Sequence, residues 1–285
     1  MSAARDWVAL TKARIQAFAT PAAAVCAYIA NDGVWDGEEI LHLCSGLTRA
    51  SSAAAAGNQA IEAEIDAAMH RTRGRPIPSG RISRRAAATA AVIGGALGCG
   101  WLLAFTNPLC AWLAVVMIFS YCFVYTPLKR LTPLNTIVGA FPGALPLLVG
   151  YSAAGNGLDL RAGILFLILF LWQLPHFFSI AWLYRDDYAR GGLRMLPGVD
   201  ATGAVSGRQA VHWALVLVPA SLLPTLAGFA GRVYFFGAFS ASLVFLASVV
   251  GFGLRRTAPR ARVVLWISLA YLPVLFTLLV LDRTL

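Results

Sequence analysis

Residues 162–184 read AGILFLILFLWQLPHFFSIAWLY and include no charged side chain. A helix of this length extends over about 35 Å, which is enough to cross the roughly 30 Å hydrocarbon core of a bilayer. The whole chain has a similar character, because 59% of its 285 residues are apolar and only 13% are charged. A soluble domain is roughly 45 to 50% apolar and 25% charged, so this chain has too few polar side chains to cover a water-facing surface. The sequence therefore predicts an integral membrane protein.

Hydropathy and helix-breaking residues predict nine membrane-spanning helices joined by short connections. The predicted spans lie near residues 15–31, 40–61, 87–106, 109–127, 134–152, 162–184, 210–229, 233–254 and 262–281. We expect a single all-α domain over residues 1–285, because these spans leave no room for a sizeable domain outside the membrane.

The basic residues are distributed unevenly between the two sides of this arrangement. Nineteen of the 23 Lys and Arg residues fall in the N-terminal segment and the even-numbered connections, whereas three fall in the odd-numbered connections and the C-terminus. Because positive residues are retained on the cytoplasmic side, we expect a cytoplasmic N-terminus and a C-terminus outside. The net charge of +10 then reflects topology in a lipid bilayer and does not indicate a nucleic-acid partner.

A stripe of oxygen-bearing side chains runs off the cytoplasmic end of the second predicted span. Asn58, Glu62 and Asp66 are four residues apart, so on a helix they line one face over roughly 12 Å. Mg²⁺ is usually held by one or two carboxylates together with phosphate oxygens of a substrate. The spacing therefore predicts a metal site, whereas Glu64 falls off this face.

The segment directly after the stripe is rich in arginine. It reads HRTRGRPIPSGR at residues 70–81 and contains Arg71, Arg73, Arg75 and Arg81. Arginine forms bidentate bonds to phosphate, so this loop beside carboxylates favours a site for Mg²⁺ and diphosphate. Taken alone, the pattern also fits a positive-inside loop whose arginines meet lipid headgroups.

Carboxylates and arginines meet again after the sixth predicted span, in YRDDYARGG at residues 184–192. This segment contains Asp186, Asp187 and Arg190. Asp187 and Arg190 lie one helical turn apart, so they could contribute to a site or form an ordinary surface ion pair.

His176 lies deeper in the same span, in the aromatic stretch LWQLPHFF that also contains Trp172. Such a histidine is either a hydrogen-bonded structural residue or a contact for a flat aromatic or metalloporphyrin substrate. A third polar element, YTPLKR at residues 125–130, ends the fourth span on the cytoplasmic side. Lys129 and Arg130 could contact phosphate or anchor the helix at the interface, where Tyr125 would fit an aromatic belt.

Together these segments resemble the UbiA superfamily of intramembrane prenyltransferases, and within it the protohaem IX farnesyltransferase (haem O synthase) branch. The resemblance covers most of the chain. Its segments are DWVALTKAR (6–14), the stripe with RTRGRP (71–76), YTPLKR followed by TPLN (132–135), and WQLPHF (172–177) through DYARGG (187–192) to MLP (195–197). The last group is the most specific, because other superfamily members carry an aspartate-rich motif there, whereas here Leu183 stands four residues before Asp187.

The resemblance implies a nine-helix prenyltransferase bundle in the bacterial cytoplasmic (inner) membrane, with its active site toward the cytoplasm. It implies that farnesyl diphosphate donates its farnesyl group to a vinyl group of haem B, with addition of water and release of diphosphate, to give haem O for terminal oxidases. Mg²⁺ is the implied cofactor, and a downstream haem A synthase is an implied partner.

The resemblance also assigns roles to residues of this chain. The implied catalytic residues are Asn58, Glu62, Asp66, Asp186 and Asp187, and the implied metal ligands are Asn58, Glu62, Asp66 and Asp187. Diphosphate contacts are implied for Arg71, Arg73, Arg75, Arg81, Tyr125, Lys129, Arg130 and Arg190, and haem contacts for His176 and Trp172. Two alternatives stay open: a UbiA-type enzyme acting on a quinone or chlorophyll precursor, and a non-catalytic haem carrier or oxidase assembly factor.

Overall fold

Helices form all of the regular secondary structure in the part of the chain that the structure describes, which contains no strand. The structure is a computed structural model that describes residues 3–155, 157–200 and 202–284. The all-helical fold class expected from the sequence is therefore confirmed.

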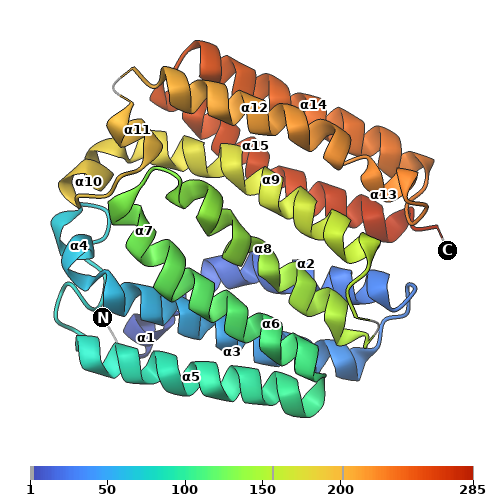
Figure 1. Cartoon of the computed structure of the whole chain (residues 1–285), viewed down its shortest axis with the longest axis horizontal. Coiled ribbons are helices and arrows are strands. Elements are labelled where there is room, and N and C mark those ends of the chain that lie inside the picture. Colours follow the sequence, from blue (N-terminus) through green and yellow to red (C-terminus); the bar gives the residue numbers. More distant parts are fainter. Residues whose placement is uncertain (1–2, 156, 201, 285) are drawn as a thin grey trace.

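Long helices run side by side through the molecule, and short helices lie near their ends (Figure 1). The long helices are α2 (Ala13–Ala30), α3 (Gly37–Ile61), α5 (Arg84–Phe105), α6 (Pro108–Phe119), α8 (Asn135–Ala153), α9 (Leu160–Leu183), α12 (Ala204–Ala220), α14 (Arg232–Leu254) and α15 (Ala258–Leu281). The short helices are α1 (Ala3–Leu10), α4 (Ala63–Ala68), α7 (Thr126–Leu131), α10 (Arg185–Arg190), α11 (Leu196–Val199) and α13 (Leu223–Leu226). A π-helical segment, η1 (Ser120–Tyr125), joins α6 to α7.

Seven helical segments of the described chain are long and apolar enough to cross a membrane. They are Arg84–Phe105, Pro108–Leu131, Asn135–Ala153, Leu160–Leu183, Ala204–Leu226, Arg232–Leu254 and Ala258–Leu281. The helices α2 and α3, which overlap the first two predicted spans, are outside this set. Both are rich in alanine, and both contain charged and amide side chains. The count of nine spans and the orientation of the two termini thus stay predictions.

The short helices α4, α10 and α11 lie at the same end of the bundle as α1, and α15 finishes at the opposite end (Figure 1). This end collects the polar segments that the sequence singled out. We call it the polar end of the bundle.

A close contact between α3 and α5 helps to fix the helix that carries the stripe. A Cβ atom added at Gly98 of α5 would lie 2.6 Å from the backbone nitrogen of Ala50 in α3. Because no side chain fits at that distance, glycine allows the two backbones to approach. On the other flank, α8, α9, α12, α14 and α15 share an apolar core that includes Tyr151, Tyr234 and Phe245.

Candidate functional site

The predicted stripe lies at the junction between α3 and α4. The amide of Glu62 donates to the carbonyl of Asn58 at 2.9 Å, and the amide of Asp66 donates to the carbonyl of Glu62 at 2.8 Å. The helical repeat therefore continues through the junction and keeps the three side chains on one face. Their exposed fractions are only 1% for Asn58, 5% for Glu62 and 1% for Asp66, which places these polar groups inside the protein.

All three side chains line a cavity of about 700 Å³ at the polar end of the bundle. We call it the polar cavity. Its cationic lining residues are Arg5, Lys12, Arg14, Arg71, Arg75 and Lys129, and its other lining residues are Val8, Ala9, Ala13, Ile15, Met69, Tyr125, Tyr188, Leu193 and Met195. Six cationic side chains face only two carboxylates, so the cavity favours a ligand that is itself strongly anionic.

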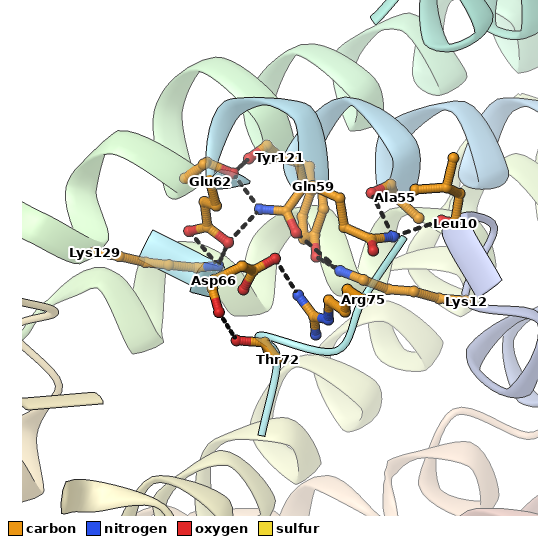
Figure 2. A network of polar contacts seen from close by, with 12 residues as sticks. Leu10, Lys12, Ala55, Gln59, Glu62, Asp66, Thr72, Arg75, Tyr121 and Lys129 are labelled. Carbon is orange, nitrogen blue, oxygen red and sulfur yellow. Dashed lines mark hydrogen bonds and ion pairs between the residues drawn. The ribbon is translucent and has the colours of Figure 1, made fainter. Parts of the chain in front are cut away.

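Two lysines contact Asn58 and Glu62 and complete the polar network; Lys12, Glu62 and Lys129 are labelled in Figure 2. Lys12 Nζ donates to Asn58 Oδ1 at 2.9 Å, and Asn58 Nδ2 donates to Glu62 Oε2 at 2.9 Å. Lys129 Nζ lies 2.9 Å from Glu62 Oε1. Four side chains from three separate segments are thereby held in one charged, hydrogen-bonded group.

Asp66 has the most distinctive surroundings of the three. Its Oδ2 accepts from Arg75 Nη1 at 2.6 Å (Figure 2). Its Oδ1 is buried and has no hydrogen-bond partner among the residues described. A buried carboxylate oxygen that lacks a partner carries a large desolvation cost, which a cation bound in the cavity would remove.

The donor set of the stripe fits Mg²⁺ shared with a substrate. Within the described ranges, no group of three or more His, Cys, Asp and Glu side chains is placed to hold a metal ion. Two carboxylates and an amide oxygen leave room for phosphate oxygens and water, which is the usual way that Mg²⁺ is bound. An all-protein metal cage is therefore not what these residues build.

Lys12 lines the polar cavity, but the sequence analysis did not predict it as a site residue and named it only as part of the DWVALTKAR motif. It joins α1 to α2 with a left-handed backbone, φ 50°, which turns the chain between the two helices. Burial and the neighbouring Lys129 and Arg75 lower the pKa of Lys12 to about 7. Gln59 ties the same region to α3, because its Nε2 donates to the carbonyl of Leu10 at 2.8 Å. In the sequence, the signal that could have identified Lys12 as a site residue was its position in the TKAR segment (11–14).

The arginines of the loop after α4 have different positions. Arg71 and Arg75 line the polar cavity, whereas Arg73 is exposed and lies outside its lining. Arg81 also lies outside; its guanidinium donates to Asp6 Oδ1 at 2.9 Å and to the carbonyl of Gly74 at 2.9 Å. The structure therefore brings two of these four arginines to the cavity and uses Arg81 to hold the loop on α1.

Asp187 holds the beginning of the same loop. Its carboxylate accepts the amide of His70 at 3.0 Å and the amide of Arg71 at 2.9 Å, and it also pairs with Arg190. Burial alone would raise the pKa of Asp187, but the bond from Arg190 and the two amides outweigh it and lower the pKa to about 2. The side chain is thus charged at neutral pH, and it is not in a metal-binding group with Glu62 and Asp66.

Of the remaining predicted site residues, apart from the two haem contacts, one lines the polar cavity and three lie outside its lining. Tyr125 lines the cavity, with Lys129 Nζ 4.6 Å from its ring centroid. Arg130, Arg190 and Asp186 lie outside the lining, and the Asp186 side chain is 79% exposed and 3.8 Å from Arg185.

The two predicted haem contacts lie inside the bundle, apart from the polar cavity. The rings of His176 and Trp172 are stacked, with centroids 4.9 Å apart and an angle of 21° between their planes. Both side chains bond to the same residue of α15: His176 Nδ1 lies 2.8 Å from Ser268 Oγ, and Trp172 Nε1 donates to the Ser268 carbonyl at 2.9 Å.

These features define a class of protein: a helical membrane bundle with a cationic, carboxylate-bearing cavity at one end, suited to a diphosphate held together with a metal ion. The pattern of the UbiA prenyltransferase family matches residues 19–280. The chain therefore belongs to the UbiA prenyltransferase family and is an integral membrane protein.

The relatives define a branch within that family. A protein from Solibacter usitatus named Protoheme IX farnesyltransferase is 46% identical over 244 residues, which cover 86% of this chain and 84% of that protein. The branch inferred from the sequence motifs is thereby confirmed.

Solved structures share the fold at low sequence identity. A structure described as digeranylgeranylglyceryl phosphate synthase has a TM-score of 0.81 and 18% identity, and the match covers 99% of both chains. A UbiA homologue from Archaeoglobus fulgidus bound to GPP and Mg²⁺ has a TM-score of 0.67 and 16% identity, and the match covers 96% of this chain and 99% of that one. These two likenesses establish the common architecture.

Proposed function

We propose that this protein transfers the farnesyl group of farnesyl diphosphate to a vinyl group of haem B and adds water, giving haem O and diphosphate. The observation that carries the proposal is the 46% identity to a protein named for this activity, in a match that covers 84% of that protein. The polar cavity supports it independently, because six cationic side chains around two carboxylates suit a diphosphate.

Asn58, Glu62 and Asp66 are the residues that would hold Mg²⁺, with the unpartnered Asp66 Oδ1 as the clearest ligand atom. Bound there, the ion would neutralise part of the negative charge on the departing diphosphate. A homologue of the same fold was solved with GPP and Mg²⁺ bound, which supports this assignment. Additional metal binding by Asp187 or Asp186 stays a prediction of the sequence.

Arg71, Arg75 and Lys129 would bind the diphosphate; their position in the cavity lining, beside the stripe, supports this role. Lys129 and Arg75 already hold the two carboxylates in place. Their positive charges would stabilise the leaving group as negative charge develops on it. Arg73, Arg81, Arg130 and Arg190 lie outside the lining, so their predicted diphosphate contacts would require the loops to move.

The group transfer balances without a covalent enzyme intermediate. The bond between the allylic carbon and the bridging oxygen breaks, and its electron pair leaves on the diphosphate. The vinyl π electrons form the new carbon–carbon bond to the allylic carbon. Water then adds to the cation left beside the porphyrin and loses a proton. The apolar bundle would exclude water from the first cation until the vinyl group has reacted.

We place the enzyme in the bacterial cytoplasmic (inner) membrane, with the polar cavity toward the cytoplasm. The basic segments at the polar end of the bundle support this orientation, because positive loops are retained on the cytoplasmic side. The product would pass to a downstream haem A synthase or directly to a terminal oxidase.

The proposal is tested by incubating purified protein with haem B, farnesyl diphosphate and Mg²⁺, with and without a chelator, and analysing the recovered haem by mass spectrometry. We expect a haem heavier by one farnesyl group and one hydroxyl group, formed only when Mg²⁺ is present. Unchanged haem from correctly folded protein would reject the proposed activity. Transfer at full rate in the chelator would reject the metal assignment.

A further inference from the structure

Ser268 of α15 contacts two stacked side chains of α9, His176 and Trp172. Its hydroxyl oxygen is 2.8 Å from His176 Nδ1, and its carbonyl accepts from Trp172 Nε1 at 2.9 Å. Ser268 is fully buried, and His176 is 9% exposed. The stacked imidazole is thus fixed in orientation by a ring on one side and by a hydrogen bond at one nitrogen.

The direction of the hydrogen bond between Ser268 and His176 follows from the other bond that the serine makes. A serine hydroxyl has one hydrogen to donate, and Ser268 Oγ donates it to the Leu265 carbonyl at 2.7 Å. The same oxygen must therefore accept from His176, so the proton of the ring is on Nδ1. Among the residues described, His176 pairs with no carboxylate and its printed partner is the Ser268 hydroxyl, so no counter-charge offsets a positive charge on the ring in this apolar interior, and the ring is neutral.

A neutral imidazole with its proton on Nδ1 presents a lone pair at Nε2. In the described part of the chain, Nε2 has no hydrogen-bond partner. An unpartnered lone pair on a ring held in a fixed orientation is available to a ligand. Histidine ligands of metals usually carry this arrangement, in which one nitrogen binds the metal and the other donates to a fixed acceptor.

We propose that Ser268 is a positioning residue that sets the tautomer and orientation of His176, so that His176 Nε2 binds the iron of the substrate haem. The inference rests on the proposed function, since it takes haem B as the ligand. Imidazole nitrogen is a common axial ligand of haem iron. The stacked Trp172 and the neighbouring Phe177, whose ring centroid is 5.8 Å from that of His176, add flat apolar surface suited to a porphyrin.

The binding step can be tested without the prenyl donor. Full-length protein in detergent is titrated with ferric haem B, and the iron is monitored by absorption and electron paramagnetic resonance spectroscopy. We expect the wild type to show a nitrogen-ligated haem. His176→Ala and His176→Gln should lose that signature, and free imidazole should restore it. Unchanged spectra in both variants would overturn the ligation.

The role of Ser268 is tested in the same titration. Ser268→Ala removes the acceptor for Nδ1, and we expect haem affinity to fall about tenfold or more, with an altered axial-ligand spectrum. Ser268→Thr keeps a hydroxyl and should retain the wild-type spectrum. Wild-type affinity and spectrum in Ser268→Ala would overturn the positioning role.

Two controls address the loss of a buried hydroxyl and of a histidine beside a tryptophan. Ser242→Ala removes a buried hydroxyl that pairs with Tyr271, and His212→Ala removes a histidine whose ring lies against Trp213. Both should bind haem as the wild type does, and equal losses in these controls would overturn the inference.

Farnesyl transfer is assayed separately. Nitrogen ligation without transfer would reject only the proposed function, whereas transfer with no dependence of the haem spectrum on His176 would reject only this inference.

Discussion

At the residue scale, the polar cavity depends most on Asp66, because one of its oxygens is paired with Arg75 and the other is buried without a partner in the described structure. The side chain can therefore be held in place by the protein and still offer an oxygen to a metal ion. A substitution that keeps its size and removes its charge should separate these two properties.

We predict that Asp66→Asn lowers the turnover number about 100-fold or more, while haem binding is retained. The neutral amide offers Mg²⁺ less negative charge than a carboxylate, and it leaves Arg75 without its counter-charge. The matched control is Glu64→Gln, because Glu64 is on the same short helix, its side chain is 89% exposed, and it pairs with the exposed Arg84 at 3.3 Å. The initial rates of both purified variants are compared with the rate of the wild type. Equal rates for Asp66→Asn and the wild type would remove Asp66 from the metal site.

The stripe itself could be predicted, because helical periodicity alone places Asn58, Glu62 and Asp66 on one face. Its partners could not. Lys12, Arg75 and Lys129 arrive from three other segments, and their convergence depends on how the helices pack. The choice of Arg71 and Arg75 over Arg73 likewise depends on the path of an irregular loop, which residue spacing does not determine.

At the element scale, the approach of α3 to α5 is expected to control where the stripe lies. Gly98→Ala would place a methyl group 2.6 Å from the backbone of Ala50, so the helices would have to separate. We predict a loss of about 1 to 3 kcal/mol of stability. Gly100→Ala is the control, since no described atom beyond its own stretch of helix lies within 4 Å of the added atom. Thermal unfolding in detergent measures both variants, and equal unfolding temperatures would contradict this prediction.

The loop after α4 provides a second prediction at this scale. In Asp187→Asn, one side-chain oxygen is replaced by an amide NH₂ group, which donates and cannot accept from a backbone amide. The turn at His70 and Arg71 therefore loses a bond that stabilises it. We predict that the KM for farnesyl diphosphate rises about tenfold, as expected when a buried amide loses its acceptor, because Arg71 is no longer held at the cavity.

The control for this prediction is the neighbouring Asp186→Asn, whose carboxylate is exposed. Steady-state kinetics with varied farnesyl diphosphate give the KM of each variant. A KM that changes equally in both would show that Asp187 does not position the loop. The sequence placed Asp187 in the site region, but it could not show that backbone amides are its partners, because those amides come from a loop more than 100 residues away.

At the scale of the whole molecule, charge and hydropathy together predict more membrane spans than the apolarity of single helices indicates. In the described part of the chain, seven segments are apolar enough to cross a membrane by themselves, whereas α2 and α3 carry buried polar groups such as Gln16 and Gln59. Polar side chains are tolerated in a membrane where they face the interior of a bundle, so α2 and α3 are expected to cross as well.

We predict that a periplasmic reporter enzyme is active when it is fused after α15 or inserted between α2 and α3. It should be inactive when it is inserted between α4 and α5, in the arginine-rich loop. Activity at the α4 to α5 position would contradict the cytoplasmic placement of the polar cavity. Expression levels of each fusion, measured with an antibody, serve as the control.

The acceptor is the central claim, and one competition experiment tests it most directly. Purified protein is given equimolar haem B and para-hydroxybenzoate, a phenolic quinone precursor, with limiting farnesyl diphosphate and Mg²⁺, and both acceptors are analysed by mass spectrometry. We predict that the farnesyl group appears on haem together with one added water, while the phenolic acid is recovered unchanged. Farnesyl on the phenolic acid with unmodified haem would contradict the account and assign the enzyme to another acceptor.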